Sequence, residues 1–179
     1  MREKKKSRNI VRKKRSSHIV SKPNYKIVNI KRVSKVVKGG KKLSFRTIII
    51  IGNKKGNVGL GIGKANDVSN SIKKAINNGK KNLITLPVTK HATIPHIVKG
   101  KFGASNVIIC PSKVGSGVIA GSSIRTVLEV AGIRNVLAKQ IGSNNLLNNA
   151  RATLDGLKQL KTINKTAKER NLNVETLYF

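Results

Sequence analysis

Apolar and polar residues alternate through residues 26–64 in a pattern typical of β-strands. Residues 26–37 are rich in Val and Ile, and the paired glycines that follow predict a tight turn, because glycine adopts positive φ at no steric cost. The next strand, residues 43–51, starts by alternating and ends in four isoleucines at 48–51, which need cover on both faces. A third strand over 58–64 places Val, Leu and Ile on one face and three glycines on the other, which predicts close approach of a protein or RNA backbone.

A pattern of apolar residues with helical period follows the third strand and predicts one helix, with Asn66 or Asp67 expected as its cap. Apolar side chains share one stripe of this helix: Val68, Ile72, Ala75, Ile76, Gly79 and Leu83. Lysines share the opposite stripe: Lys73, Lys74, Lys80 and Lys81. No acidic residue is interleaved to form i, i+4 ion pairs, so the lysine stripe indicates a phosphate-facing edge rather than a solvated surface. Three strands and this helix predict a small α+β layer that ends near Pro87.

The second half of the chain predicts another α+β layer. Strands are expected over 94–101, 105–110 and 135–141, one helix that stops at Gly132, and a last helix capped by Asn144 or Asn145. The predicted organisation is a basic disordered arm (1–22), a first domain (23–90), a second domain (91–161) and a tail (162–179) that adds a short helix or frays. The predicted fold class is therefore α+β, with two small two-layer α/β domains.

The net charge of the chain restricts the class of molecule that it can bind. The chain carries 38 Lys and Arg against six Asp and Glu, a formal net charge of +32, and no acidic residue lies between Glu3 and Asp67. A compact domain so charged repels itself, which predicts a polyanionic partner, and nucleic acid fits because neutralised phosphates release counterions. A membrane is not expected, because no apolar run approaches the roughly 20 residues of a spanning helix. Aromatic residues are only 3% of the chain, which favours recognition of backbone and shape over base stacking.

The sequence gives little support for a nucleotide-binding site, a metal site or a catalytic site. Residues 59–64 lack the Ser or Thr and the earlier glycine of a phosphate-binding loop. Residues 115–120 satisfy G-x-G-x-x-A, yet the strand after the following helix ends without an acid for a ribose hydroxyl. Cys110 is the single cysteine, is expected to be buried, and has no ligand spacing with the three histidines. We therefore expect no metal, no cofactor, no catalytic residues and no enzyme activity, and no homo-oligomer.

Four separated motifs, at residues 32–45, 56–65, 117–121 and 142–153, resemble the family of the fifth protein of the small ribosomal subunit, bacterial type. They occur in the family's order, and the resemblance covers residues 24–161. It implies a first domain similar to a double-stranded-RNA-binding fold and a second domain with the family's C-terminal α/β fold. It also implies a structural role: binding small-subunit rRNA, contacting the fourth and eighth proteins of the subunit, lining the mRNA entry path and supporting decoding accuracy.

The resemblance makes the loop over 34–42, with Phe45 and Arg46, the principal RNA contact. With the other basic turns and the lysine stripe, the predicted RNA-binding residues are Arg32, Ser34, Lys35, Lys38, Gly39, Gly40, Lys41, Lys42, Phe45, Arg46, Lys54, Lys55, Lys64, Lys73, Lys74, Lys80 and Lys81. The residues predicted near the fourth-protein interface are Gly117, Gly121 and Arg125.

The sequences of residues 121–123 and 144–150 resemble those of plastid and cyanobacterial members of this family. The many Lys, Asn and Ile residues suggest an AT-rich genome. A plastid ribosome is therefore expected, with the bacterial cytoplasm as the alternative location. Two other functions stay open at this point. One is a free double-stranded-RNA-binding or RNA chaperone module, and the other is a nucleotide-dependent enzyme.

Overall fold

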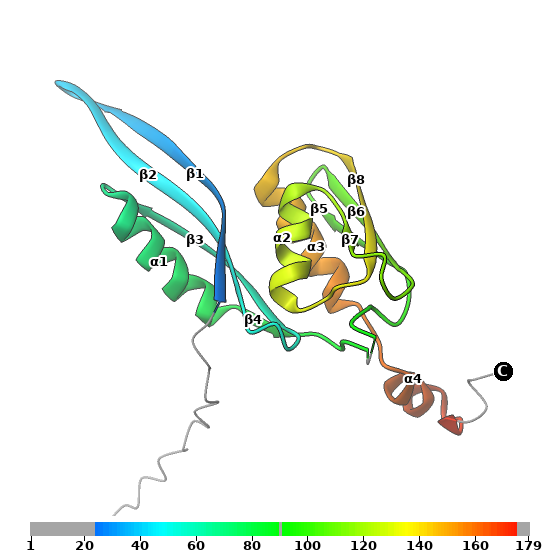
Figure 1. The fold of residues 1–179 in the computed structure, drawn as a ribbon. Helices are drawn as coiled ribbons and strands as arrows, with labels where there is room; N and C mark the ends of the chain where they lie inside the picture. The colour runs from blue at the N-terminus through cyan, green and yellow to red at the C-terminus, as the bar shows by residue number, and fades with distance from the viewer. Residues whose placement is uncertain (1–23, 90, 175–179) are drawn as a thin grey trace, which may run out of the picture.

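The computed structural model describes residues 24–89 and 91–174, in which two sheets lie side by side with helices against them (Figure 1). The N-terminal sheet is antiparallel with strand order β1-β2-β3-β4. Its strands are β1 (Asn24–Val37), β2 (Gly40–Gly52), β3 (Asn57–Ala65) and β4 (Leu83–Thr85). Helix α1 (Val68–Lys81) covers one face, and β1 and β2 continue past it as a long hairpin (Figure 1).

The C-terminal sheet has strand order β5-β6-β8-β7, antiparallel except for the β7–β8 pair. Its strands are β5 (Val98–Phe102), β6 (Ser105–Pro111), β7 (Val118–Ile119) and β8 (Val136–Gly142). Helices α2 (Ser122–Ala131) and α3 (Leu146–Lys158) pack on it, and α4 (Ile163–Arg170) follows. Two domains of mixed helix and strand confirm the predicted α+β class.

The glycine face of β3 admits the backbone of α1. A Cβ atom on Gly61 would overlap the carbonyl oxygen of Ala75, and one on Gly59 would lie 2.7 Å from the carbonyl oxygen of Gly79. Helix and strand therefore touch backbone to backbone. The backbone predicted to approach the glycine face of β3 is therefore the protein backbone of α1. On the same face, Thr47 of β2 forms a buried hydrogen bond with Ser71 of α1.

The opposite face of the N-terminal sheet packs on the second domain. Ile50 and Val58 belong to one buried cluster with residues of α2 such as Val127 and Leu128. The four isoleucines of β2 are at most 6% exposed, which confirms that they need cover on both faces. Their cover is α1 on one side and the C-terminal domain on the other.

Several boundaries differ from the sequence expectation. Leu83 opens β4 instead of ending α1, and β7 forms inside the G-x-G-x-x-A segment at 115–120, where the sequence predicts no strand. Strand β5 begins at Val98 and not at residue 94, since Pro95 has no backbone N–H to donate. Cys110 is only half-buried, because it lies on the outer face of β6. Asn145 caps α3 by accepting a hydrogen bond from the Leu147 N–H at 3.2 Å.

The predicted tail contains α4, which confirms the short helix. Lys161, just before it, forms an ion pair with Glu169, and this hydrogen bond lowers the pKa of the Glu169 carboxyl. The backbone N–H of Lys161 also donates to the Nε2 atom of His96. The basic arm (1–22) and residues 175–179 lie outside the described residues, and the four predicted segment boundaries stay predictions.

Candidate nucleic-acid interface

The hairpin of β1 and β2 stays paired to its tip. Val37 lies opposite Gly40, which leaves a two-residue turn of Lys38 and Gly39. Gly39 has φ of +89°, a conformation that glycine adopts without strain. One β-bulge, between Ile27 and Asn29, interrupts an otherwise continuous register. The turn therefore fixes which side chains face each other from the tip as far as Asn29.

The register places basic residues opposite one another. Lys35 lies opposite Lys42, and Lys31 lies opposite Arg46, which in turn lies opposite Lys64 of β3. Directly opposed side chains point to the same face of a sheet, and all five are exposed. They form a cationic face, defined as Lys31, Lys35, Lys42, Arg46 and Lys64. Like charges placed opposite one another destabilise the free sheet, so this face suits an anionic partner.

The other face of the hairpin differs in chemistry. Thr47, which points to α1, shares this face with Phe45 two residues before it. Exposed apolar side chains accompany Phe45 here, among them Val36 (74% exposed) and Leu43 (51%). Arg32 lies opposite Phe45, so it also belongs to this face. The structure thus places the adjacent residues Phe45 and Arg46 on opposite sides of the sheet.

The lysines of α1 form a separate group. Lys73, Lys74, Lys80 and Lys81 are all exposed, as the stripe predicts. The Lys74 ammonium donates to the backbone carbonyl of Lys64 at 3.5 Å, which connects the stripe to the end of β3. Lys80 and Lys81 are in the last turn of the helix, where they also complement the helix dipole.

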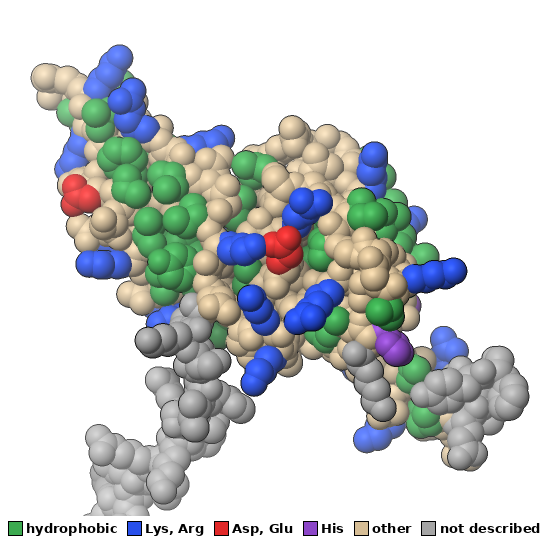
Figure 2. Space-filling model, viewed as in Figure 1, with side chains coloured by type: hydrophobic (Ala, Val, Ile, Leu, Met, Phe, Trp, Pro, Cys, Tyr) green, Lys and Arg blue, Asp and Glu red, His purple; other side chains and the backbone are tan. Residues whose placement is uncertain are grey.

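Lys54 and Lys55 are not part of the hairpin surface. They occupy the turn between β2 and β3, at the opposite end of the sheet and against the second domain. Ser34, Lys38, Gly39, Gly40 and Lys41 are at or beside the hairpin tip. The predicted RNA-binding residues therefore fall into three places: the hairpin, α1 and the domain junction. Figure 2 shows basic side chains at the hairpin end and around the junction of the two domains.

Few carboxylates oppose these cations. In residues 24–89 and 91–174 there are four, and each has a partner. Glu129 pairs with Lys26, and Glu169 pairs with Lys161. Asp67 accepts a hydrogen bond from Asn70, and Asp155 accepts one from Gln159. None of these carboxylates pairs with the cationic face, so its charge is not neutralised within the described chain.

Gly117, Gly121 and Arg125 come together at one corner of the C-terminal domain. The Gly117 carbonyl accepts from the Val136 N–H, and Gly121 precedes the first turn of α2. The Arg125 guanidinium donates to the Val118 carbonyl at 3.2 Å, which folds its side chain back over β7. All three predicted interface residues thus lie around this short strand.

Sequence reasoning missed Lys31. It lies outside the predicted loop, yet the hairpin register brings it opposite Arg46. Counting outward from the turn at Lys38 and Gly39 gives this pairing from the sequence alone. Arg46 and Lys31 also line a small pocket with Asn145 and Leu147 of the C-terminal domain, which no sequence pattern indicates.

Comparison with known proteins agrees with this architecture. The family described as "Ribosomal protein S5, N-terminal domain" matches residues 24–87, and "Ribosomal protein S5, C-terminal domain" matches residues 100–170. The chain belongs to the ribosomal protein S5 family. S5 proteins are structural components of the small ribosomal subunit and not enzymes.

Named S5 relatives are similar over most of their length. The "Small ribosomal subunit protein uS5c" of Rhodomonas salina is 60% identical over 147 residues, 82% of this chain and 88% of the relative. The uS5c of Cyanophora paradoxa is 55% identical over 166 residues, 92% of this chain and 98% of the relative. The cyanobacterial uS5 of Thermosynechococcus vestitus is 57% identical over 153 residues, 86% and 88%.

These relatives support the plastid assignment of this S5 chain, because uS5c is the chloroplast-type protein. Among the described residues, no cluster of His, Cys, Asp and Glu is able to hold a metal ion. In that same part of the chain, every helix is too short or too polar to cross a bilayer.

Proposed function

We propose that the cationic face of the hairpin is the principal contact of this chain with small-subunit rRNA. The supporting observation is the register that stacks Lys31, Arg46 and Lys64 across three strands, with Lys35 and Lys42 beyond them. Arginine and lysine so placed bind successive phosphates without reading base edges. The tip residues Lys38 to Lys41 and the lysines of α1 extend the contact as flanking phosphate ligands.

The C-terminal domain supplies the proposed protein contacts. The corner formed by Gly117, Gly121 and Arg125 contacts the fourth protein of the subunit and so influences decoding accuracy. Contact with the eighth protein and a place beside the mRNA entry path complete the proposal. An outer sheet face with exposed Ile119 (53%) and Leu137 (47%) supports protein neighbours for this domain, since apolar surface of this kind is commonly covered in an assembly.

Replacing Lys31, Arg46 and Lys64 together with methionine tests the RNA contact. The variant removes charge and keeps the aliphatic stems, so we expect weaker binding to a small-subunit rRNA transcript and a shallower salt dependence. A control with methionine at Lys165, Lys168 and Arg170 of α4 removes the same charge elsewhere. Equal loss of affinity in both variants would show that binding depends on net charge and not on this face.

Co-sedimentation separates the proposal from a free RNA-binding or chaperone module. A ribosomal constituent stays with small subunits through a moderate salt wash, whereas a free module is released. For the fourth-protein contact, Arg125→Gln is expected to weaken binding to that protein in a reconstituted pair. Arg170→Gln, on α4 and exposed, is the matched control. Unchanged pair affinity for Arg125→Gln would remove this corner from the interface.

A further inference from the structure

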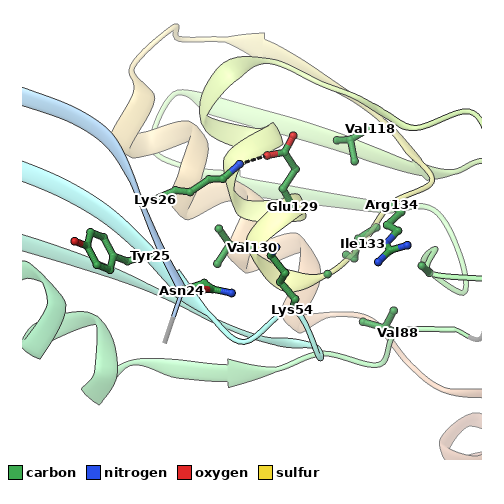
Figure 3. A pocket seen from close by; sticks show the side chains of 12 residues that line it. Asn24, Tyr25, Lys26, Lys54, Val88, Val118, Glu129, Val130, Ile133 and Arg134 are labelled. Atoms are coloured by element: carbon green, nitrogen blue, oxygen red, sulfur yellow. Dashed lines mark hydrogen bonds and ion pairs between the residues drawn. The ribbon is translucent and has the colours of Figure 1, made fainter. Parts of the chain in front are cut away.

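A hollow of about 890 Å³ lies where the two domains meet (Figure 3). The start of β1 and the β2–β3 turn line one side, and the end of α2 with the segment after it lines the other. Val88, Val118 and Ile133 supply apolar walls. Its volume falls in the range of about 300–1,000 Å³ that ligands of small-molecule size occupy.

Three cations and one carboxylate line this hollow. Lys26 forms an ion pair with Glu129, which neutralises both groups (Figure 3). Lys54 from the first domain and Arg134 from the second form no ion pair with any described residue. The hollow therefore keeps two uncompensated positive charges, one from each domain.

Backbone hydrogen bonds hold these two cations in place. The Lys54 N–H donates to the Val130 carbonyl at 3.1 Å, and the Gly56 N–H donates to the Ala131 carbonyl at 2.9 Å. These bonds satisfy two carbonyls at the end of α2 that the helix leaves unpaired. The Arg134 N–H donates to the Ala92 carbonyl at 2.8 Å. Lys54 is thus fixed to the end of α2, and Arg134, which follows that helix, is fixed to Ala92.

The backbone around the hollow is strained. Lys54 has φ of +56° and Ala92 has φ of +53°, and these are two of the three non-glycine residues with positive φ in the described chain. In this conformation the Cβ atom lies too close to the following carbonyl oxygen, so each such residue is disfavoured. Strain of this kind persists where surrounding structure enforces it, and it concentrates at binding sites. Two strained residues lining one hollow therefore point to a binding role.

We propose that this junction hollow binds an RNA backbone phosphate between Lys54 and Arg134, so that one RNA strand contacts both domains. The inference rests on the proposed rRNA-binding function and adds a second contact to it. The Arg134 guanidinium matches a phosphate with two parallel hydrogen bonds, and the Lys54 ammonium adds a point charge. The apolar walls suit the adjoining ribose. Because the ligand spans both domains, RNA binding here also stabilises their relative placement.

The test compares Lys54→Met/Arg134→Met with Lys165→Met/Lys168→Met, which removes the same charge from α4. Both pairs are exposed, so their melting temperatures should match that of the wild type. Affinity for a small-subunit rRNA transcript is measured over a salt series. We expect the junction variant to lose about one phosphate equivalent of salt slope beyond the control. An identical slope in the two variants would overturn the inference.

A second measurement locates the RNA. With Cys110→Ser and Tyr25→Cys, an iron chelate attached at the rim of the hollow cleaves any RNA strand beside it. Cleavage should disappear with Lys54→Met/Arg134→Met and persist with the α4 control. Absence of cleavage, or cleavage that survives the junction variant, would refute the site. Weaker binding by the hairpin variant, with cleavage at the junction retained at saturating RNA, separates the two proposals, whereas a wild-type chain that binds no rRNA overturns both.

Discussion

Lys35 and Lys42 lie directly opposite each other near the tip of the β1–β2 hairpin. Their ammonium groups are on the same face, and neither has an acidic partner in the described chain. Like charges in this arrangement work against strand pairing, so the isolated hairpin holds this geometry at a cost. An RNA phosphate between the two strands would reverse the sign of the interaction.

Lys35→Glu should therefore have opposite effects on stability and binding. The new cross-strand pair with Lys42 replaces a repulsion, and we expect the free energy of unfolding to rise by about 0.2–1 kcal/mol. RNA affinity should fall, because one favourable phosphate contact becomes a repulsion. Urea unfolding and rRNA titration measure the two effects. If the variant binds RNA as well as the wild type, this pair is not part of the contact.

Neutralising Lys38, Lys41 and Lys42 together tests the tip. Each phosphate contact contributes about 0.7–0.9 to the slope of log affinity against log salt. Methionine at all three positions should flatten that slope by about three phosphate equivalents and leave folding unchanged, since the three side chains are exposed. The salt series of rRNA binding gives the result. An unchanged slope would remove the tip from the RNA contact.

The sequence predicts the main elements of both domains because their patterns are local. Four consecutive isoleucines indicate a doubly covered strand, and the glycine face of β3 indicates a close backbone. It does not reveal β4 and β7, because strands of three and two residues carry too little periodicity to stand out. Their presence depends on pairing with β3 and β8.

The candidate interface can be predicted only in part, because sequence patterns are local. Clusters such as Lys41 and Lys42 are visible in the chain, whereas the row formed by Lys31, Arg46 and Lys64 exists only after register is set. The junction hollow is still harder to predict from the sequence. It joins Lys54 to Arg134 through the packing of two domains, which no local pattern predicts.

Gly61→Ala should destabilise the N-terminal domain. The added Cβ would overlap the Ala75 carbonyl, and this atom belongs to helix backbone that is unable to turn aside. We expect a loss of about 1–3 kcal/mol in the free energy of unfolding, measured with urea. Gly121→Ala is the control, since its Cβ would meet the end of the Gln140 side chain at 3.1 Å and no helix backbone. Equal losses in the two variants would contradict the proposed backbone contact of β3 and α1.

Glu169 should titrate below its ordinary pKa of 4.5. The hydrogen bond from Lys161 stabilises the ionised carboxylate, so its contribution to holding α4 is present above the ordinary pKa. This contribution disappears as the pH falls through the lowered value, when the carboxylate gains a proton. An NMR titration of Glu169 measures the pKa, and Lys161→Met should return it toward 4.5. A titration curve unaffected by that substitution would exclude the ion pair in solution.

The buried pair of Thr47 and Ser71 should respond unequally to its two single substitutions. The Ser71 hydroxyl donates to the Val68 carbonyl at 2.7 Å, so the hydrogen between the two side chains comes from Thr47. Ser71→Ala leaves the Thr47 hydroxyl buried without an acceptor, which costs about 1–3 kcal/mol. Thr47→Val keeps the shape of the side chain, and Ser71 keeps its bond to Val68, so this change should cost about 1 kcal/mol or less.

The double variant of this pair distinguishes a hydrogen bond from simple packing. With Ser71→Ala in place, Thr47→Val removes the stranded hydroxyl, so the double variant should be more stable than Ser71→Ala alone. Urea unfolding of all four proteins closes the cycle. Additive losses would mean that the two hydroxyls do not interact, and the contact between β2 and α1 would then depend on the apolar residues Ile49, Ile51 and Ala75.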